Sequence, residues 1–231
     1  MRALRAVRAA LRGGFYAVLD RDDEVLARTL VGAGGARLLQ VRIKPAGVRD
    51  IVRVARMARR VCDEAGAQLI VNDRIDIALA VGADGVHLGQ TDIPLADACA
   101  IAGTRLAIGV STHDLEQVRR AVSLAPAYIA YGPIFATTTK QDPDPVQGLP
   151  ALRAAVRAAG DIPVVAIGGI TPATARAVYA TQATSICAIS AVNAAPDVSA
   201  AAHAFRRQNP WLKHTGAYTI LRWHPAMLHD E

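Results

Sequence analysis

Polar and apolar side chains alternate over residues 38–44, a spacing typical of a β-strand. A period of two predicts one polar face, formed by Gln40, Arg42 and Lys44, while the other face is apolar: Leu39, Val41 and Ile43. Two buried cations beside an amide are costly without an anionic partner, so the polar face favours a phosphate or pyrophosphate ligand. The alternative is a strand end that frays into solvent and leaves these side chains exposed.

Two carboxylates follow the next two predicted strands. Asn72 and Asp73 end one segment, and Asp92 lies in the turn after the next. Mg²⁺ typically takes one or two protein carboxylates and completes its shell with water and phosphate oxygens. Beside Arg42 and Lys44, this pair predicts a site for Mg²⁺ and pyrophosphate. Taken alone, either aspartate is more typical of a helix N-cap or a turn.

A long loop begins at residue 132 and carries hydroxyl groups and a cation, from Thr137, Thr138, Thr139 and Lys140. Loops of this length in a compact barrel are usually functional, although a solvated surface loop is the alternative. Gly169 ends a later apolar segment. Ile189 and Ser190 belong to the last one. Backbone amides at such places commonly bind phosphate, and glycine allows an anion to approach closely, but ordinary turns also contain glycine pairs.

Three further positions carry a serine or a histidine. Ser111 ends another predicted strand and His113 follows it, but neither a nucleophile elbow nor an orienting acid is evident. We therefore interpret Ser111 as a hydrogen-bonding residue and His113 as the start of a helix. His87 has no second histidine at metal-ligand spacing, which favours a histidine whose hydrogen bonds are satisfied within the protein.

Short apolar segments alternate with segments of helical periodicity along the chain. The predicted strands cover residues 15–20, 37–43, 68–73, 85–89, 105–111, 128–134, 162–169 and 185–192. The predicted helices between them include residues 48–64, 95–102, 114–123, 149–159 and 172–180. Such an alternation implies parallel strands, and eight units in about 190 residues predict an α/β fold of the (β/α)₈ TIM-barrel type. A doubly wound open sheet is the alternative, but the glycine-rich turn typical of that fold does not follow the first strand.

The predicted barrel domain covers residues 1–207. Four arginines at helical spacing indicate a short capping helix within residues 1–14, from Arg2, Arg5, Arg8 and Arg12. An Arg-rich transit peptide is the alternative, although that stretch contains no Ser or Thr. Residues 208–231 hold both tryptophans and three of the six histidines, and we expect a C-terminal extension whose role the sequence does not reveal.

The amino-acid composition favours some classes of protein and argues against others. With 231 residues, 52% apolar and 20% charged, the chain is typical of a soluble globular protein. The net charge of +6 favours anionic ligands, but the scattered basic residues and 4% aromatic content argue against nucleic-acid binding. No apolar run is long enough for a membrane span. Cys62, Cys99 and Cys187 lack disulfide or zinc spacing, so we expect reduced thiols in a cytoplasmic protein. Assembly into a homo-oligomer stays open.

Seven motifs appear in order: QVRIK (40–44), VND (71–73), GQTD (89–92), GVSTH (109–113), GPIFATTTK (132–140), AIGGI (166–170) and AIS (188–190). Together they resemble the thiamine-phosphate synthase family over roughly residues 15–205. The resemblance implies a (β/α)₈-barrel transferase of thiamine biosynthesis. Such an enzyme joins 4-amino-5-hydroxymethyl-2-methylpyrimidine pyrophosphate to 4-methyl-5-(2-phosphonooxyethyl)thiazole, with Mg²⁺, and releases thiamine phosphate and pyrophosphate.

The resemblance also implies roles for individual residues. It assigns Mg²⁺ to Asp73 and Asp92. It assigns catalysis to Arg42, Lys44, Ser111 and Lys140. The pyrimidine pyrophosphate is assigned to Gln40, Val41, Arg42, Ile43, Lys44, Asn72, Ser111 and Lys140. The thiazole phosphate is assigned to Thr137, Thr138, Thr139, Gly169, Ile189 and Ser190.

One position departs from the family pattern. Members often carry Glu where this chain has Ile43, and strand alternation turns this side chain away from Arg42, so we expect a change in packing and not in chemistry. Two other functions stay open: a thiazole tautomerase of the same fold, and a barrel that senses thiamine phosphates without turnover.

Overall fold

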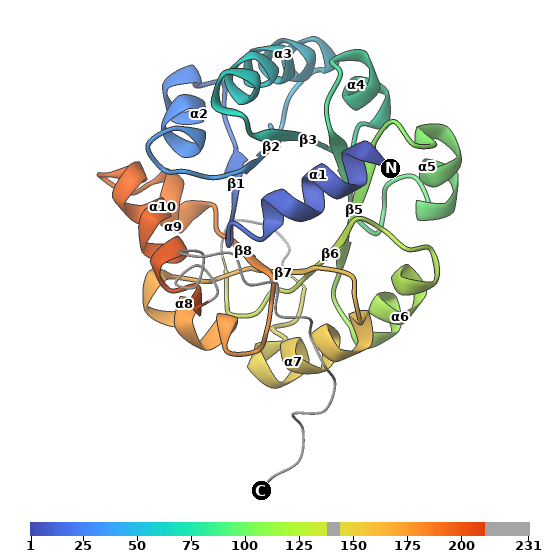
Figure 1. Ribbon diagram of the computed structural model, residues 1–231, viewed down its shortest axis with the longest axis vertical. Coiled ribbons are helices and arrows are strands. Elements are labelled where there is room, and N and C mark those ends of the chain that lie inside the picture. The colour runs from blue at the N-terminus through green and yellow to red at the C-terminus, as the bar shows by residue number, and fades with distance from the viewer. Residues whose placement is uncertain (138–143, 211–231) are drawn as a thin grey trace, which may run out of the picture.

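Eight parallel strands close into a barrel in chain order, with helices around it (Figure 1). The computed structural model describes residues 1–137 and 144–210. Its strands are β1 (Phe15–Leu19), β2 (Leu38–Val41), β3 (Gln68–Asn72), β4 (Gly85–Leu88), β5 (Ala107–Thr112), β6 (Tyr128–Tyr131), β7 (Val164–Ile167) and β8 (Ser185–Cys187). The helices are α1 (Arg2–Leu11), α2 (Glu24–Val31), α3 (Val48–Ala65), α4 (Ile75–Ala80), α5 (Leu95–Ala102), α6 (Leu115–Ser123), α7 (Gly148–Ala159), α8 (Pro172–Tyr179), α9 (Ser190–Asn193) and α10 (Val198–Arg207). The prediction of a (β/α)₈ barrel is confirmed.

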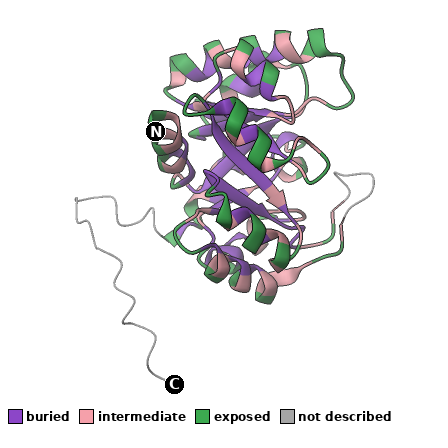
Figure 2. Ribbon diagram, turned by 90° about the vertical axis from the view of Figure 1, so that its right-hand side faces the viewer, coloured by how far each residue is buried: buried purple, intermediate pink, exposed green. Residues whose placement is uncertain are grey.

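The alternation of side chains along the strands divides the buried residues into two cores. On β2, Leu39 and Val41 pack between strand and helices, whereas Leu38 packs inside the barrel with Tyr16 and Ile70. Burying a leucine or valine side chain contributes about 1.5–3 kcal/mol, so both faces of each strand stabilise the closed sheet. Figure 2 shows the buried strands at the centre and exposed residues on the outer faces of the helices.

The amino-terminal end of the barrel is covered by α1. Val7 and Leu11 are buried and pack into the interior core. Arg8 donates hydrogen bonds of 3.0 Å to the carbonyls of Ala127 and of Pro126. The helix lies across the barrel axis in Figure 1, so ligand access is left to the opposite end, where the strands have their carboxyl termini.

Several strands are shorter than the sequence predicts. The predicted strand at 185–192 is wrong beyond Cys187, because Asn193 N donates to Ile189 O and its side chain donates to Val18 O, which turns the chain into α9. β6 ends at Tyr131, before Pro133, which has no amide hydrogen for a ladder. β7 ends at Ile167 because Gly168 and the next glycine take positive φ angles. These early ends make room for loops at the barrel mouth.

The last described α-helix, α10, packs against the first strand. Phe205 of α10 stacks on Phe15 of β1, with 5.6 Å between ring centroids. Residues 211–231, most of the extension expected over 208–231, lie outside the described part of the chain. In that described part, no helix has both the length and the hydropathy of a membrane span.

Candidate active site

Polar side chains occupy interior positions where adjacent strands end, and they define the barrel mouth: Gln40 and Arg42 of β2 and its extension, Asn72 of β3, His87 of β4 and Ser111 of β5. Asn72 is in register with His87, and Ser111 with Ala130. Four of these positions were identified from the sequence as candidate ligand contacts. The closed barrel brings them to one end of the molecule.

The polar residues predicted on the second strand differ in their surroundings. Gln40 is buried, and its Nε2 donates to the Tyr16 hydroxyl at 2.7 Å. The Arg42 guanidinium is close enough to lower the pKa values of both His87 and Cys187, although burial dominates each shift and raises that of Cys187. The charge of Arg42 therefore acts on the interior of the mouth.

Arg42 is only partly buried and Lys44 is exposed, which corrects the expectation of two buried cations. The Lys44 side chain is 52% exposed and its Nζ lies 2.7 Å from Asp73 Oδ2. The physical reason is that β2 ends at Val41, so strand alternation no longer fixes Lys44. Ile43, in contrast, packs against the core beneath the helices, so the position that is often Glu in the family contributes packing here.

Asp73 and Asp92 lie together. Asp73 follows β3 with a φ of 61°, a conformation in which aspartate is enriched, and its amide donates to His87 O at 2.8 Å. Asp92 Oδ2 accepts from Gly89 N at 2.7 Å. Burial raises the pKa of Asp92. The hydrogen bond from Gly89 N lowers this pKa, whereas the neighbouring Asp73 carboxyl raises it further. Two adjacent carboxylates repel each other, and a cation between them would relieve that repulsion.

The donor set fits Mg²⁺. Among the described residues no group of three or more His, Cys, Asp or Glu side chains could hold a metal ion. A two-carboxylate site is typical of Mg²⁺, which keeps several waters and takes substrate phosphate oxygens as its other ligands. A transition-metal centre would need more nitrogen or sulfur donors than this mouth offers.

His87 has a hydrogen-bond partner at each ring nitrogen, as the sequence predicted for a satisfied histidine. Its Nδ1 lies 3.0 Å from the Tyr128 hydroxyl and its Nε2 lies 2.8 Å from Ser111 Oγ. Burial lowers its pKa to about 4. Sequence reasoning missed Tyr16 and Tyr128; the available signal was their strand parity, which turns both side chains inward.

The glycine pair after β7 meets the loop that follows β6. Gly169 has a φ of +65°, and a Cβ there would collide with the backbone of Phe135 and Ala136. Phe135 N also donates to Gly168 O at 3.1 Å. Close packing of the protein's own loop thus requires glycine at position 169. The sequence alone instead predicts that this glycine allows an anion to approach.

Of the remaining residues predicted to contact substrate, three are described by the structure and three are not. Thr137 is partly buried at the end of the described loop, and Ile189 and Ser190 lie at the start of α9 after β8. Thr138, Thr139 and Lys140 lie outside the described residues.

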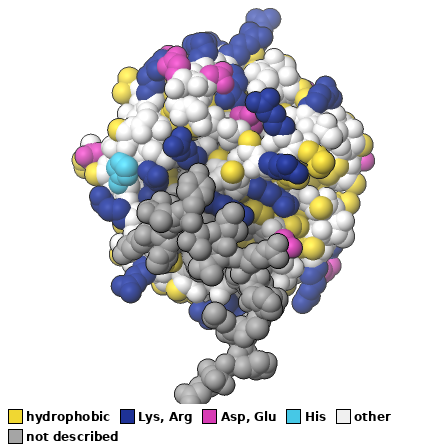
Figure 3. Space-filling view, viewed as in Figure 1, with side chains coloured by type: hydrophobic (Ala, Val, Ile, Leu, Met, Phe, Trp, Pro, Cys, Tyr) yellow, Lys and Arg dark blue, Asp and Glu magenta, His cyan; other side chains and the backbone are white. Residues whose placement is uncertain are grey.

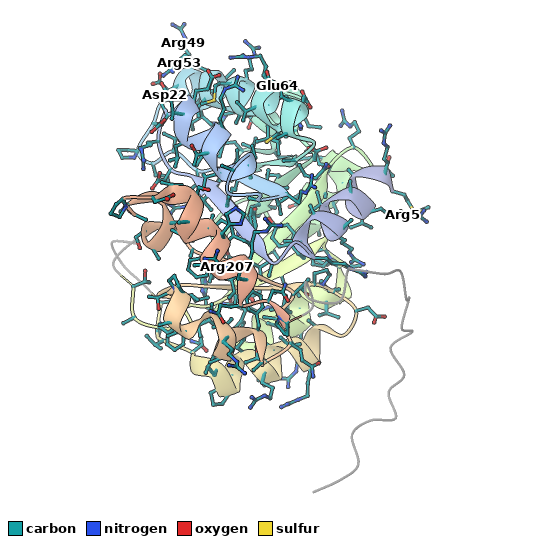
Figure 4. The ribbon with its side chains drawn as sticks, turned by 60° about the vertical axis from the view of Figure 1, so that its left-hand side comes forward. Arg5, Asp22, Arg49, Arg53, Glu64 and Arg207 are labelled. Atoms are coloured by element: carbon teal, nitrogen blue, oxygen red, sulfur yellow. The ribbon has the colours of Figure 1, made fainter. Side chains whose placement is uncertain are left out.

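Charged side chains outside the mouth are spread over the surface. Lys and Arg side chains are scattered across the face that carries α1 (Figure 3). On α3, Arg53 forms ion pairs with Asp22 and Asp50, and the labelled Arg53 and Asp22 lie together in Figure 4. Such exposed pairs contribute little stability.

The fold and the mouth define a (β/α)₈-barrel enzyme with a site suited to a phosphorylated small molecule. The family model described as thiamine monophosphate synthase matches residues 15–192. A thiamine-phosphate synthase of Chloroflexus aurantiacus is 49% identical over 173 residues, 75% of this chain and 79% of the relative. One from Neisseria meningitidis is 44% identical over 192 residues, 83% of this chain and 92% of the relative.

Comparison with solved structures points to the same family and fold. Thiamine phosphate pyrophosphorylase from Pyrococcus furiosus has a TM-score of 0.79 and 36% identity, and the match covers 87% of this chain and 97% of that one. A 3-hexulose-6-phosphate synthase, with a TM-score of 0.64 and 19% identity, shares the fold. The chain belongs to the thiamine-phosphate synthase family, whose members are transferases.

Proposed function

We propose that this protein joins 4-amino-5-hydroxymethyl-2-methylpyrimidine pyrophosphate to 4-methyl-5-(2-phosphonooxyethyl)thiazole, forming thiamine phosphate and pyrophosphate. The observation that carries the proposal is the adjacent pair Asp73 and Asp92 with Lys44 at 2.7 Å, beside Arg42, in a member of this family. A pyrophosphate leaving group needs such cations and metal ligands. Isomerisation of a thiazole or passive sensing does not.

The leaving group is assigned to the charged part of the mouth. Asp73 and Asp92 would hold Mg²⁺, which when bound offsets the negative charge of pyrophosphate. Arg42 and Lys44 stabilise the oxygen that separates from the pyrimidine methylene, because fixed positive groups lower the barrier where negative charge develops. Lys140, which follows β6 in the sequence, is assigned the same task.

The pyrimidine ring is assigned to the polar interior positions beneath this charge. Gln40, Asn72 and Ser111 offer amide and hydroxyl groups to it, while the backbone of Val41 and Ile43 continues the same wall. The electron-rich aminopyrimidine supports a methylene cation once pyrophosphate leaves. The mouth then has to hold the thiazole nitrogen in line with this carbon and exclude water, which are effects of orientation and desolvation.

The thiazole phosphate is assigned to the loops after β6, β7 and β8. Their candidate contacts are Thr137, Thr138, Thr139, Gly169, Ile189 and Ser190. Support comes from Ile134 N, which donates to Ile167 O at 2.9 Å and joins the loop after β6 to the end of β7. Phosphate sites at these loops are common in this fold.

The test uses purified protein with both substrates and Mg²⁺, scored for thiamine phosphate with and without EDTA. We expect product that disappears with the chelator. Proton exchange on the thiazole carboxylate phosphate without condensation would instead identify a tautomerase, and binding without any turnover would identify a sensor. We further propose a cytoplasmic location, in keeping with soluble phosphorylated substrates.

A further inference from the structure

A continuous chain of hydrogen bonds crosses the barrel interior. We call it the interior chain: Gln40, Tyr16, Tyr128, His87 and Ser111, from five different strands. The successive separations are 2.7 Å from Gln40 Nε2 to the Tyr16 hydroxyl, 2.8 Å between the two tyrosine hydroxyls, 3.0 Å to His87 Nδ1, and 2.8 Å from His87 Nε2 to Ser111 Oγ. Both ends are candidate substrate contacts, and the three middle residues are not.

The packing around the middle residues holds them in one arrangement. The Tyr16 and Tyr128 rings meet edge to face with centroids 5.7 Å apart, and His87 stacks on Tyr128 at 5.6 Å with the planes 12° apart. A Cβ on Gly109 would collide with the Tyr128 ring. Phenylalanine would fill the same volume, so the two hydroxyl groups contribute hydrogen bonds and not packing.

The interior chain has a direction. An amide nitrogen only donates, so Gln40 Nε2 donates to the Tyr16 oxygen. The Tyr16 oxygen could accept a second bond from Tyr128, but its own hydrogen would then have no partner within the interior chain. The direction that gives this hydrogen a partner has Tyr16 donate to Tyr128. Tyr128 in turn donates to His87 Nδ1. The neutral ring carries its hydrogen on Nε2 and donates it to Ser111 Oγ. Ser111 is left with its own hydroxyl hydrogen to donate.

We propose that the interior chain fixes Gln40 as an acceptor, through Oε1, and Ser111 as a donor toward the substrate at the barrel mouth. Tyr16, Tyr128 and His87 are then positioning residues for the pyrimidine pyrophosphate. The assignment of that substrate rests on the proposed function. The proposed direction of the chain does not, because it concerns contacts within the protein alone.

The direction is tested by the tautomer of His87 in ¹⁵N-labelled protein without substrate. Nitrogen chemical shifts distinguish a hydrogen on Nε2 from one on Nδ1, and His87→Gln identifies the signals among the six histidines. We expect the Nε2–H tautomer in the wild type and a mixture in Tyr128→Phe, where Nδ1 loses its donor. An Nδ1–H wild type, or a Tyr128→Phe variant with an unchanged tautomer, would overturn the proposal.

The positioning role is tested by binding and kinetics in Tyr128→Phe, with Tyr179→Phe as the matched control. Tyr179 is equally buried, and its hydroxyl donates to Gly14 O, outside the interior chain. Calorimetry with Mg²⁺ gives the Kd for pyrimidine pyrophosphate without requiring turnover. We expect Tyr128→Phe to raise this Kd and the corresponding KM about tenfold, with the KM for thiazole phosphate changed by less than about twofold.

Both variants lose one buried hydrogen bond, so both should lower Tm, but only Tyr128→Phe should weaken pyrimidine binding. An unchanged Kd in Tyr128→Phe, or an equal rise in Tyr179→Phe, would refute the positioning role. Wild-type protein that binds the pyrimidine pyrophosphate but forms no thiamine phosphate would refute the proposed function. The interior chain would still be judged by the Kd and the tautomer.

Discussion

Two aspartates at opposite ends of the barrel each pair with a cation, yet their surroundings differ. Asp84, just before β4, accepts from Arg59 at 2.6 Å and from Leu69 N at 2.8 Å, and the Arg59 side chain is only 16% exposed. Asp73, just after β3, pairs with the exposed Lys44. The first pair joins a helix to a strand in the barrel wall. The second lies at the open mouth.

The difference shows which pair serves folding. Asp84 has positive and backbone donors around it, an arrangement that stabilises a carboxylate. Asp73 instead lies against Asp92, whose pKa is raised by burial and then by Asp73 itself. Lys44 offsets part of the repulsion between these two carboxylates, and we interpret the remaining cost as that of a ligand-binding arrangement.

The largest effect is expected from Asp92→Asn, which keeps an oxygen to accept from Gly89 N but removes the charge. We expect kcat to fall on the order of a thousandfold, because the metal and leaving-group charge lose a partner. Metal-free stability should stay unchanged or rise, since the repulsion with Asp73 disappears. Steady-state kinetics and thermal unfolding measure the two effects. A near-normal kcat would remove Asp92 from the site.

The opposite result is expected from Asp84→Asn, which leaves Arg59 with less compensation at the other end of the barrel. We expect a loss of about 2 kcal/mol in the free energy of unfolding, moderated because Arg59 also pairs with Asp63. The kcat per folded molecule should change by less than about twofold. Urea unfolding and kinetics on the same preparation provide the check. A large loss of kcat with full stability would break the comparison.

A smaller effect is expected from Lys44→Met. The Lys44 side chain is half exposed, so its pair with Asp73 contributes less than about 1 kcal/mol to stability. Its interaction with the multiply charged pyrophosphate is stronger than this pair, and we expect the KM for pyrimidine pyrophosphate to rise about tenfold. Arg53→Met, which breaks the exposed pairs of this α3 residue with Asp22 and Asp50, is the control. Equal KM values for the two variants would contradict a role for Lys44.

Most of the fold could be predicted from the sequence because both the two-residue period of the strands and the helical period of the intervening segments are regular. Leu39 and Val41 of the alternating pattern pack in the same core as the buried face of α3. The strand ends could not be predicted equally well. Residues 185–192 form one mostly apolar segment, but the side chain of Asn193 donates a hydrogen bond to Val18 O and residues 190–193 form a helix.

The candidate site could be predicted where chemistry follows the strand period. Gln40 and Arg42 are in this class, and Asp73 and Asp92 follow from the shared rim. The exposure of Lys44 could not be predicted, because it depends on where β2 ends. The interior chain also could not, because the contact of Tyr16 with Tyr128 joins residues 112 positions apart and depends on barrel closure.

The most direct test of the central claim is Mn²⁺ binding in the presence of pyrophosphate, followed by electron paramagnetic resonance. Wild type, Asp73→Asn and Asp84→Asn form a matched set, because each variant replaces one paired aspartate by its amide. We predict tight binding of Mn²⁺ in wild type and in Asp84→Asn, and at least about tenfold weaker binding in Asp73→Asn. Equal affinity in Asp73→Asn and wild type would contradict the assignment of the barrel mouth as the metal and pyrophosphate site.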